Sequence, residues 1–220
     1  MAQDTLVREL SGSRHYRNET TAVNGWLVFG CLAVFALVNG VSIALLHQGY
    51  GIDLAREYGV LESAQSMLLA AGFVVFVLGW REAEGPAKTA SFALAMLAAA
   101  MFVRELDVKK FNGPDWYNWL GRHGLQEILL VGMTLPILYY LARRRQHWLG
   151  LLKMTFSPST VPLVIAGTLI LVGAYFDRRV ASFPTKIFWE ELVELNGYMF
   201  FVLSGYIHLR LVRAGKIGAD

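Results

Sequence analysis

The chain alternates long apolar runs with short polar segments. Val23 to Leu46 is a run of 24 residues without a charge, and a helix needs roughly 20 apolar residues to cross the hydrocarbon core of a bilayer. The later apolar runs carry no polar stripe of the kind that marks the helices of a soluble bundle. The pattern predicts an all-α polytopic membrane protein with six transmembrane helices arranged as three hairpins. The predicted helices cover 23–46, 60–80, 89–107, 125–142, 160–177 and 188–209.

Composition agrees with a location in a membrane. Hydrophobic residues make up 55% of the 220 residues and charged residues only 17%, a balance that argues against a soluble domain. The single cysteine, Cys31, falls inside the first predicted helix, so the chain has no intrachain disulfide.

Basic residues indicate the side of the membrane on which each connection lies. The N-terminal segment and the connections after the second, fourth and sixth helices hold 12 of the 20 Lys and Arg residues, against 6 acidic residues. The remainder of the chain holds 8 basic and 11 acidic residues. Since segments rich in Lys and Arg stay in the cytoplasm, we expect a multi-pass protein of the cell inner membrane, typical of bacteria, with both termini cytoplasmic. The predicted domains are a cytoplasmic segment at 1–22, the six-helix domain at 23–209 and a cytoplasmic tail at 210–220.

An internal repeat is a further hypothesis. The second, fourth and sixth helices end at the predicted cytoplasmic side in Arg81, Arg143 and Arg210, which are 62 and 67 residues apart. A repeated helical hairpin has a period of this size, so the three hairpins are candidates for one repeated unit.

Carboxylates gather at the opposite, outward ends of the predicted helices. The third and fifth apolar runs reach the length of a membrane crossing only if their helices extend through Glu105 and Asp177. A charge at membrane depth costs roughly 2.5–3.5 kcal/mol, so a group of acids there requires partners, protons or a bound cation. This predicted carboxylate cluster is a candidate site for a metal cation or a polar ligand. Its residues are Glu62, Glu105, Glu127, Asp177, Glu191 and Glu194.

The same acids also have a purely structural interpretation. A glutamate in the first turn of a helix interacts favourably with the helix dipole. Glu62 with Gln65, and Glu194 with Asn196, carry polarity deeper into the helices than this role requires. Carboxylate and amide oxygens suit divalent cations such as Mg²⁺, Ca²⁺ or Mn²⁺. A proton relay is equally permitted, because a carboxyl group removed from water binds a proton more readily.

No motif in the sequence indicates another cofactor. The chain has no glycine-rich nucleotide-binding loop. We expect no haem, because His208 falls near the inner face whereas His47 and His123 fall near the outer face. The basic residues are explained by topology, so they do not indicate nucleic-acid binding.

Three classes of function fit these observations. The first is a binding or transport protein whose outward carboxylates accept a cation, a proton or a polar solute. The second is a non-catalytic assembly or accessory subunit, with another membrane protein or a second copy of the chain as its partner in the bilayer. The third is a metal-dependent enzyme that acts on a lipid headgroup, which requires several of the acids to converge at metal–ligand distance.

Overall fold

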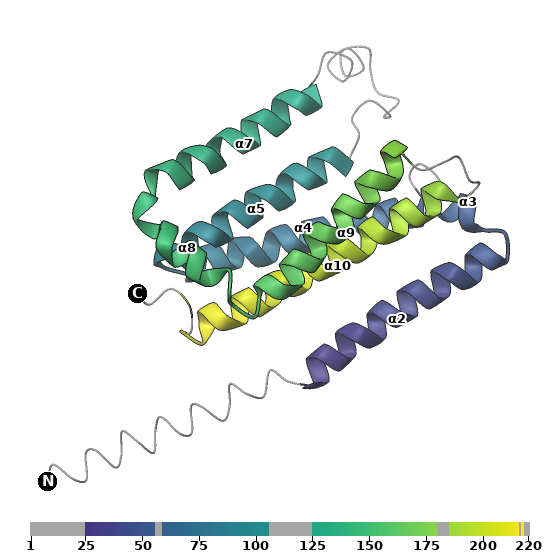
Figure 1. Cartoon of the computed structure of the whole chain (residues 1–220), viewed down its shortest axis with the longest axis horizontal. Helices are drawn as coiled ribbons and strands as arrows, with labels where there is room; N and C mark the ends of the chain where they lie inside the picture. The colour runs from purple at the N-terminus through teal and green to yellow at the C-terminus, as the bar shows by residue number, and fades with distance from the viewer. Residues whose placement is uncertain (1–24, 56–58, 106–124, 180–184, 216, 218–220) are drawn as a thin grey trace, which may run out of the picture. The chain divides into compact units, whose positions relative to one another are not determined.

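All regular secondary structure in the described part of the chain is helical. The computed structural model describes residues 25–55, 59–105, 125–179, 185–215 and 217 (Figure 1). The long helices are α2 (Gly25–His47), α4 (Val60–Glu82), α5 (Gly85–Glu105), α7 (Leu125–Arg143), α9 (Thr160–Arg179) and α10 (Lys186–Arg213). Short helices are α3 (Gly51–Leu54), the 3₁₀ helix η2 (Arg145–His147) and α8 (Trp148–Met154). The predicted all-α class is confirmed.

Three of these helices are long and apolar enough to cross a membrane. They cover Phe29–His47, Val60–Glu82 and Gly85–Glu105, and a shorter apolar helix covers Thr160–Phe176. Many large apolar side chains are exposed on the helices, such as that of Leu171, which is 72% exposed. Because water-soluble proteins rarely expose extended apolar surface, these helices suggest association with a membrane.

The chain divides into two units, Met1–Val41 and Ser42–Asp220. The first unit is described from residue 25 onward, where it consists of the greater part of α2 and exposes Phe29, Leu32 and Leu37. The predicted cytoplasmic segment at 1–22 lies outside the described residues, and so do 216 and 218–220 of the predicted tail.

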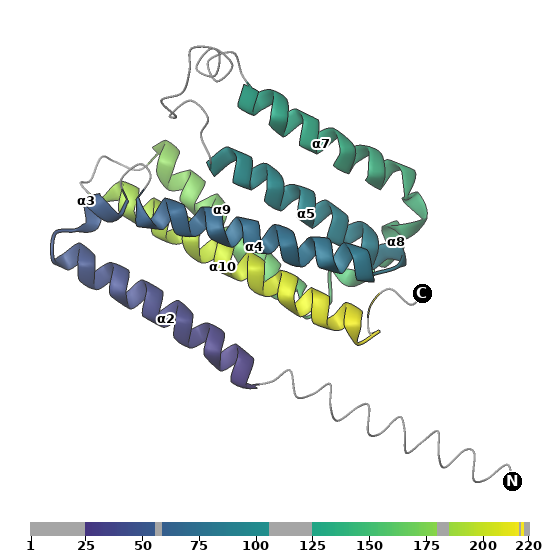
Figure 2. The ribbon, with the colours of Figure 1, turned by 180° about the vertical axis from the view of Figure 1, so that it is seen from behind.

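In the second unit, α4, α5, α9 and α10 pack around one apolar core. Helix α10 contacts α9 and α4, α4 contacts α5, and α7 packs on the other side of α5 (Figures 1 and 2). One aromatic pair lies at the centre, where the rings of Phe76 on α4 and Phe201 on α10 are 5.0 Å apart between centroids. Ala95 and Ala98 of α5 and Ala166 of α9 complete the buried cluster.

Small residues set how closely the helices approach. A Cβ atom at Gly197 would lie 2.8 Å from Cγ1 of Ile170 and 3.2 Å from the backbone oxygen of Ala166. A larger residue at 197 would therefore push α10 away from α9, in the way that small residues govern helix packing in membranes.

Helix ends differ from the predicted boundaries where polar residues continue a helix. Helix α5 begins at Gly85, four residues before the predicted start at 89, and Gly85 has a φ of 52° that favours glycine. Pro86 follows, and its missing N–H costs little in the first turn of a helix. Helix α10 runs from Lys186 to Arg213 and exceeds the predicted 188–209 at both ends.

The two ends of the packed helices differ in chemistry. At one end, Arg213 of α10 donates two hydrogen bonds of 2.7 Å to the carboxylate of Glu82 on α4. Beside this pair, Ala83, Ala87 and Val212 form a small buried cluster. The opposite end holds buried carboxylates, which form the candidate site.

Candidate functional site

One arginine joins two carboxylates and a tyrosine between α5 and α10. The guanidinium of Arg104 donates to Glu105 Oε1 over 2.7 Å, to Glu194 Oε2 over 3.2 Å and to the Tyr198 hydroxyl over 3.0 Å. The Tyr198 hydroxyl in turn donates to Glu105 Oε1 over 2.8 Å. We call these four residues the Arg104 network. Hydrogen bonds between ionised groups are among the stronger ones in proteins, so the network fastens α5 to α10.

Burial is unequal within the Arg104 network. The side chains of Glu105 and Glu194 are only 11% and 9% exposed, whereas that of Arg104 is 42% exposed. Tyr198 is fully buried. The carboxylates thus lie inside the helix packing, and the guanidinium reaches them from the surface.

A second polar contact lies one helical turn away on α10. The amide nitrogen of Gln65 on α4 donates to the backbone oxygen of Glu191 over 2.9 Å and to Glu191 Oε2 over 2.8 Å. Gln65 is fully buried, and its Oε1 has no hydrogen-bond partner among the described residues. A buried polar atom without a partner is costly, so this oxygen identifies a place where a donor or a cation fits.

A glycine of helix α9, Gly173, lies against the side chain of Glu194. A Cβ atom at Gly173 would lie 2.5 Å from Glu194 Cγ and 3.1 Å from Glu194 Oε1. The missing side chain at 173 therefore provides the space in which the Glu194 carboxylate lies.

The three carboxylates of this region have different partners. Glu105, Glu191 and Glu194 provide three carboxylates, and Arg104 is hydrogen-bonded to two of them while Glu191 receives the neutral amide of Gln65. Among the described residues, the only hydrogen-bond donor to the Glu191 side chain is this neutral amide. A partly buried carboxylate without a cationic donor favours a proton.

The six acids predicted from the sequence are placed differently from one another. Glu105 and Glu194 meet at Arg104, and Glu191 lies one turn before Glu194 on α10. Glu62 is half-buried in the first turn of α4, one turn before Gln65. Glu127 and Asp177 belong to α7 and α9, but their side chains lie outside the part that the structure describes. Within the described residues, no group of three or more His, Cys, Asp or Glu is placed to hold a metal ion.

Known proteins do not identify the chain. No protein family, characterised protein or solved structure matches it. Its function is therefore inferred from the chemistry of the residues above.

Sequence reasoning missed two polar contacts between helices. Tyr198 follows Glu194 by four positions, so the two share a helix face, and this spacing was the available signal. At the other end, Ser91 of α5 lies 2.7 Å from Nε2 of His208 on α10, and both are buried. A Cβ atom at Gly79 of α4 would lie 3.1 Å from Ser91 Oγ. Three helices therefore meet closely at this pair, which fits a structural role.

Proposed function

We propose that the chain is an integral membrane protein of six transmembrane helices that binds and releases a proton at the carboxyl groups of Glu191 and Glu194. The helices α2, α4, α5, α7, α9 and α10 coincide with the six apolar segments, which supports six crossings. The distribution of basic residues supports cytoplasmic termini. This orientation puts the Arg104 network toward the outer face of an inner membrane.

The observation that carries the proposal is the Gln65 amide beside Glu191, whose oxygen has no hydrogen-bond partner among the described residues. An ionised carboxylate only accepts hydrogen bonds, whereas a protonated one also donates. A proton on Glu191 thus supplies a donor next to an amide whose oxygen accepts no hydrogen bond from the described residues. It also removes one negative charge from a half-buried position.

Arg104 makes a proton a better ligand than a metal ion. Its guanidinium already lies between Glu105 and Glu194, at 2.7 and 3.2 Å from their oxygens. A divalent cation shared by these carboxylates would have to displace the arginine. A proton needs only one oxygen atom and leaves the arginine in place.

Proton binding also changes the pairing of α5 with α10. With Glu194 ionised, Arg104 is shared between Glu194 and Glu105. With Glu194 protonated, its attraction for the guanidinium falls, and the ion pair of Arg104 with Glu105 remains. Uptake of a proton therefore loosens one of the contacts that hold α10 against α5, which couples protonation to helix movement.

Carbodiimide labelling tests the proposal. Dicyclohexylcarbodiimide reacts with protonated carboxyl groups in apolar surroundings, and mass spectrometry locates the modified residue. We expect label on Glu191 or Glu194 that decreases as the pH rises. Glu84, an exposed carboxylate before α5, is the internal control and should stay unmodified. Absence of label at both Glu191 and Glu194 across the pH range would overturn the proposal.

A further inference from the structure

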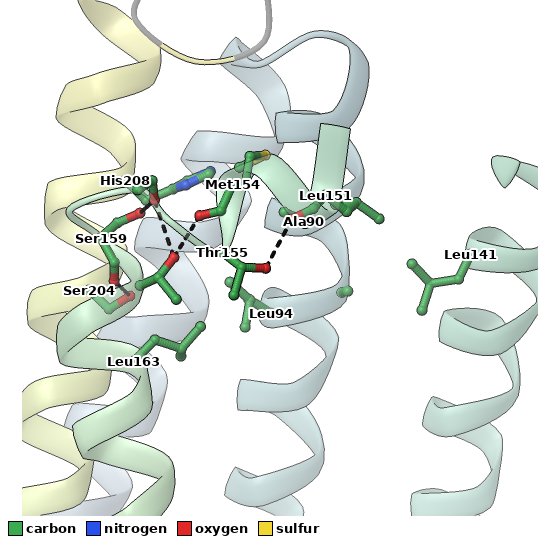
Figure 3. A pocket seen from close by; sticks show the side chains of 13 residues that line it. Ala90, Leu94, Leu141, Leu151, Met154, Thr155, Ser159, Leu163, Ser204 and His208 are labelled. Carbon is green, nitrogen blue, oxygen red and sulfur yellow. Dashed lines mark hydrogen bonds between the residues drawn. The ribbon is translucent and has the colours of Figure 1, made fainter. Parts of the chain in front are cut away.

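A pocket lies at the end of the helices opposite the Arg104 network. Its volume is about 230 Å³, and residues of α5, α7, α8, α9 and α10 line it. Much of its wall is apolar. Figure 3 shows Leu94 of α5 and Leu163 of α9 on one side, with Leu141 of α7 pointing toward them across the space. Because three separate helices supply these leucines, the pocket is a feature of the packed helices and not of one loop.

The polar groups of the pocket are mostly occupied by one another. The Ser157 hydroxyl is 2.7 Å from that of Ser159 and 3.2 Å from that of Thr160. Thr160 donates to the backbone oxygen of Met154, and Ser204 donates to that of Ser159. These bonds hold the connection between α8 and α9 against α10. Because these polar groups are already hydrogen-bonded, the space open to a ligand is mainly apolar. Such a space suits a hydrocarbon chain better than a polar molecule.

Cationic residues lie close in sequence to a residue that lines the pocket. Leu141 lines the pocket, and a run of three arginines begins two positions later, at Arg143, Arg144 and Arg145. Tyrosines orient two of the guanidinium groups. Arg143 donates to the Tyr139 hydroxyl over 2.7 Å, and Arg144 lies 5.5 Å from the centre of the Tyr140 ring.

Helix α8 has the character of a helix at a membrane surface. Trp148, Leu149 and Leu152 are 54%, 74% and 64% exposed, and Lys153 is exposed beside them. An exposed apolar face next to basic residues is typical of helices that lie at the boundary of headgroups and acyl chains. The indole nitrogen of Trp148 donates to the backbone oxygen of Leu141, which ties α8 to the last turn of α7, where Arg143 lies.

We propose that the pocket seats one acyl chain of an anionic phospholipid whose phosphate pairs with Arg144 and Arg145. The apolar wall of the pocket contacts the acyl chain. The guanidinium groups bind the phosphate, which arginine binds in a bidentate manner. The inference uses the membrane location stated under Proposed function, but it does not depend on proton binding at the other end of the helices.

Lipid binding to the detergent-solubilised full chain tests the inference by native mass spectrometry. The probes are dioleoylphosphatidylglycerol, which is anionic, and dioleoylphosphatidylcholine, which has the same chains and no net charge. We expect the wild-type protein to prefer the anionic lipid. Replacing Arg144 and Arg145 by Gln should reduce that affinity about five-fold for each arginine, whereas Arg81→Gln, at an exposed position on α4, should leave it unchanged.

Substitutions that fill the pocket test whether it binds the acyl chain of the lipid. Ala93 lines the pocket, so Ala93→Phe should weaken the binding of both lipids, and the smaller Ala93→Val should do so to a lesser extent. Ala70→Phe, at an exposed position on α4, is the matched control. If Ala93→Val and Ala93→Phe bind the anionic lipid as tightly as Ala70→Phe does, the pocket is not the lipid site. If the double arginine variant keeps the wild-type lipid preference, the headgroup assignment is wrong.

The proposals of proton binding and of lipid binding can be refuted independently of each other. Glu191→Gln removes the proposed proton site and should leave lipid binding unchanged. An equal loss of lipid binding in Glu191→Gln and Ala93→Phe would overturn the lipid inference, because the two residues lie at opposite ends of the helices.

Discussion

Gly173→Ala tests whether the space beside Glu194 is required by the site. A Cβ atom at 173 would lie 2.5 Å from Glu194 Cγ, which is closer than such atoms approach in proteins. Either the Glu194 side chain or helix α9 must therefore move. If the side chain moves, Glu194 Oε2 leaves its 3.2 Å contact with Arg104. We expect the alanine to destabilise the protein by about 1–3 kcal/mol through overpacking.

Gly167→Ala is the matched control on the same helix. Nothing lies within 4 Å of a Cβ atom at 167. Both substitutions add a methyl group to α9 and gain the same helix propensity, about 1 kcal/mol. The difference between the two variants therefore reports the contact with Glu194 alone.

Thermal unfolding of the two variants in detergent measures this difference. We expect the Tm of Gly173→Ala to lie several degrees below that of Gly167→Ala, because a change of 1 kcal/mol shifts the Tm of a chain of this size by about 2–4 °C. Equal Tm values, together with unchanged carbodiimide labelling of Glu194, would refute the close packing of α9 on the carboxylate.

Two further substitutions test the polar contacts between helices. Tyr198→Phe removes the hydroxyl that donates to Glu105, and should lower the free energy of unfolding by about 1–3 kcal/mol because the carboxylate loses a buried donor; an unfolding free energy equal to that of the wild type would contradict this contact. Ser91→Ala deprives the His208 ring of its partner and should cost a similar amount. Ser63→Ala, at an exposed position on α4, should have no measurable effect on unfolding, and an equal loss in both serine variants would argue against the His208 contact.

The fold follows from sequence where the signal is local. The sequences of α2, α4 and α5 each contain a stretch that is long and apolar enough to cross a membrane, which is visible without reference to the rest of the chain. The ends of helices are less clear from sequence, because polar residues such as Lys186 and Arg213 extend a helix without changing the apolar pattern.

The candidate site depends on side-chain contacts between helices that are far apart in the sequence. Glu191 and Glu194 stand out as acids in an apolar segment, so their polarity was visible. The partner of Glu191 is Gln65, which lies 126 positions away, and the partners of Tyr198 come from the end of α5. Such pairs are fixed by which helices pack together, and no local pattern records this. The predicted repeat and the predicted membrane orientation stay predictions.

Infrared spectroscopy in a pH titration detects proton binding at Glu191 and Glu194 themselves. A protonated carboxyl group has a C=O stretching band that an ionised carboxylate lacks, so proton binding is seen at the group itself. We expect a band that appears on acidification and disappears or weakens in Glu191→Gln or Glu194→Gln, while Glu84→Gln leaves it unchanged. A band that is the same in the wild type and in both of the first two variants would contradict proton binding at Glu191 and Glu194.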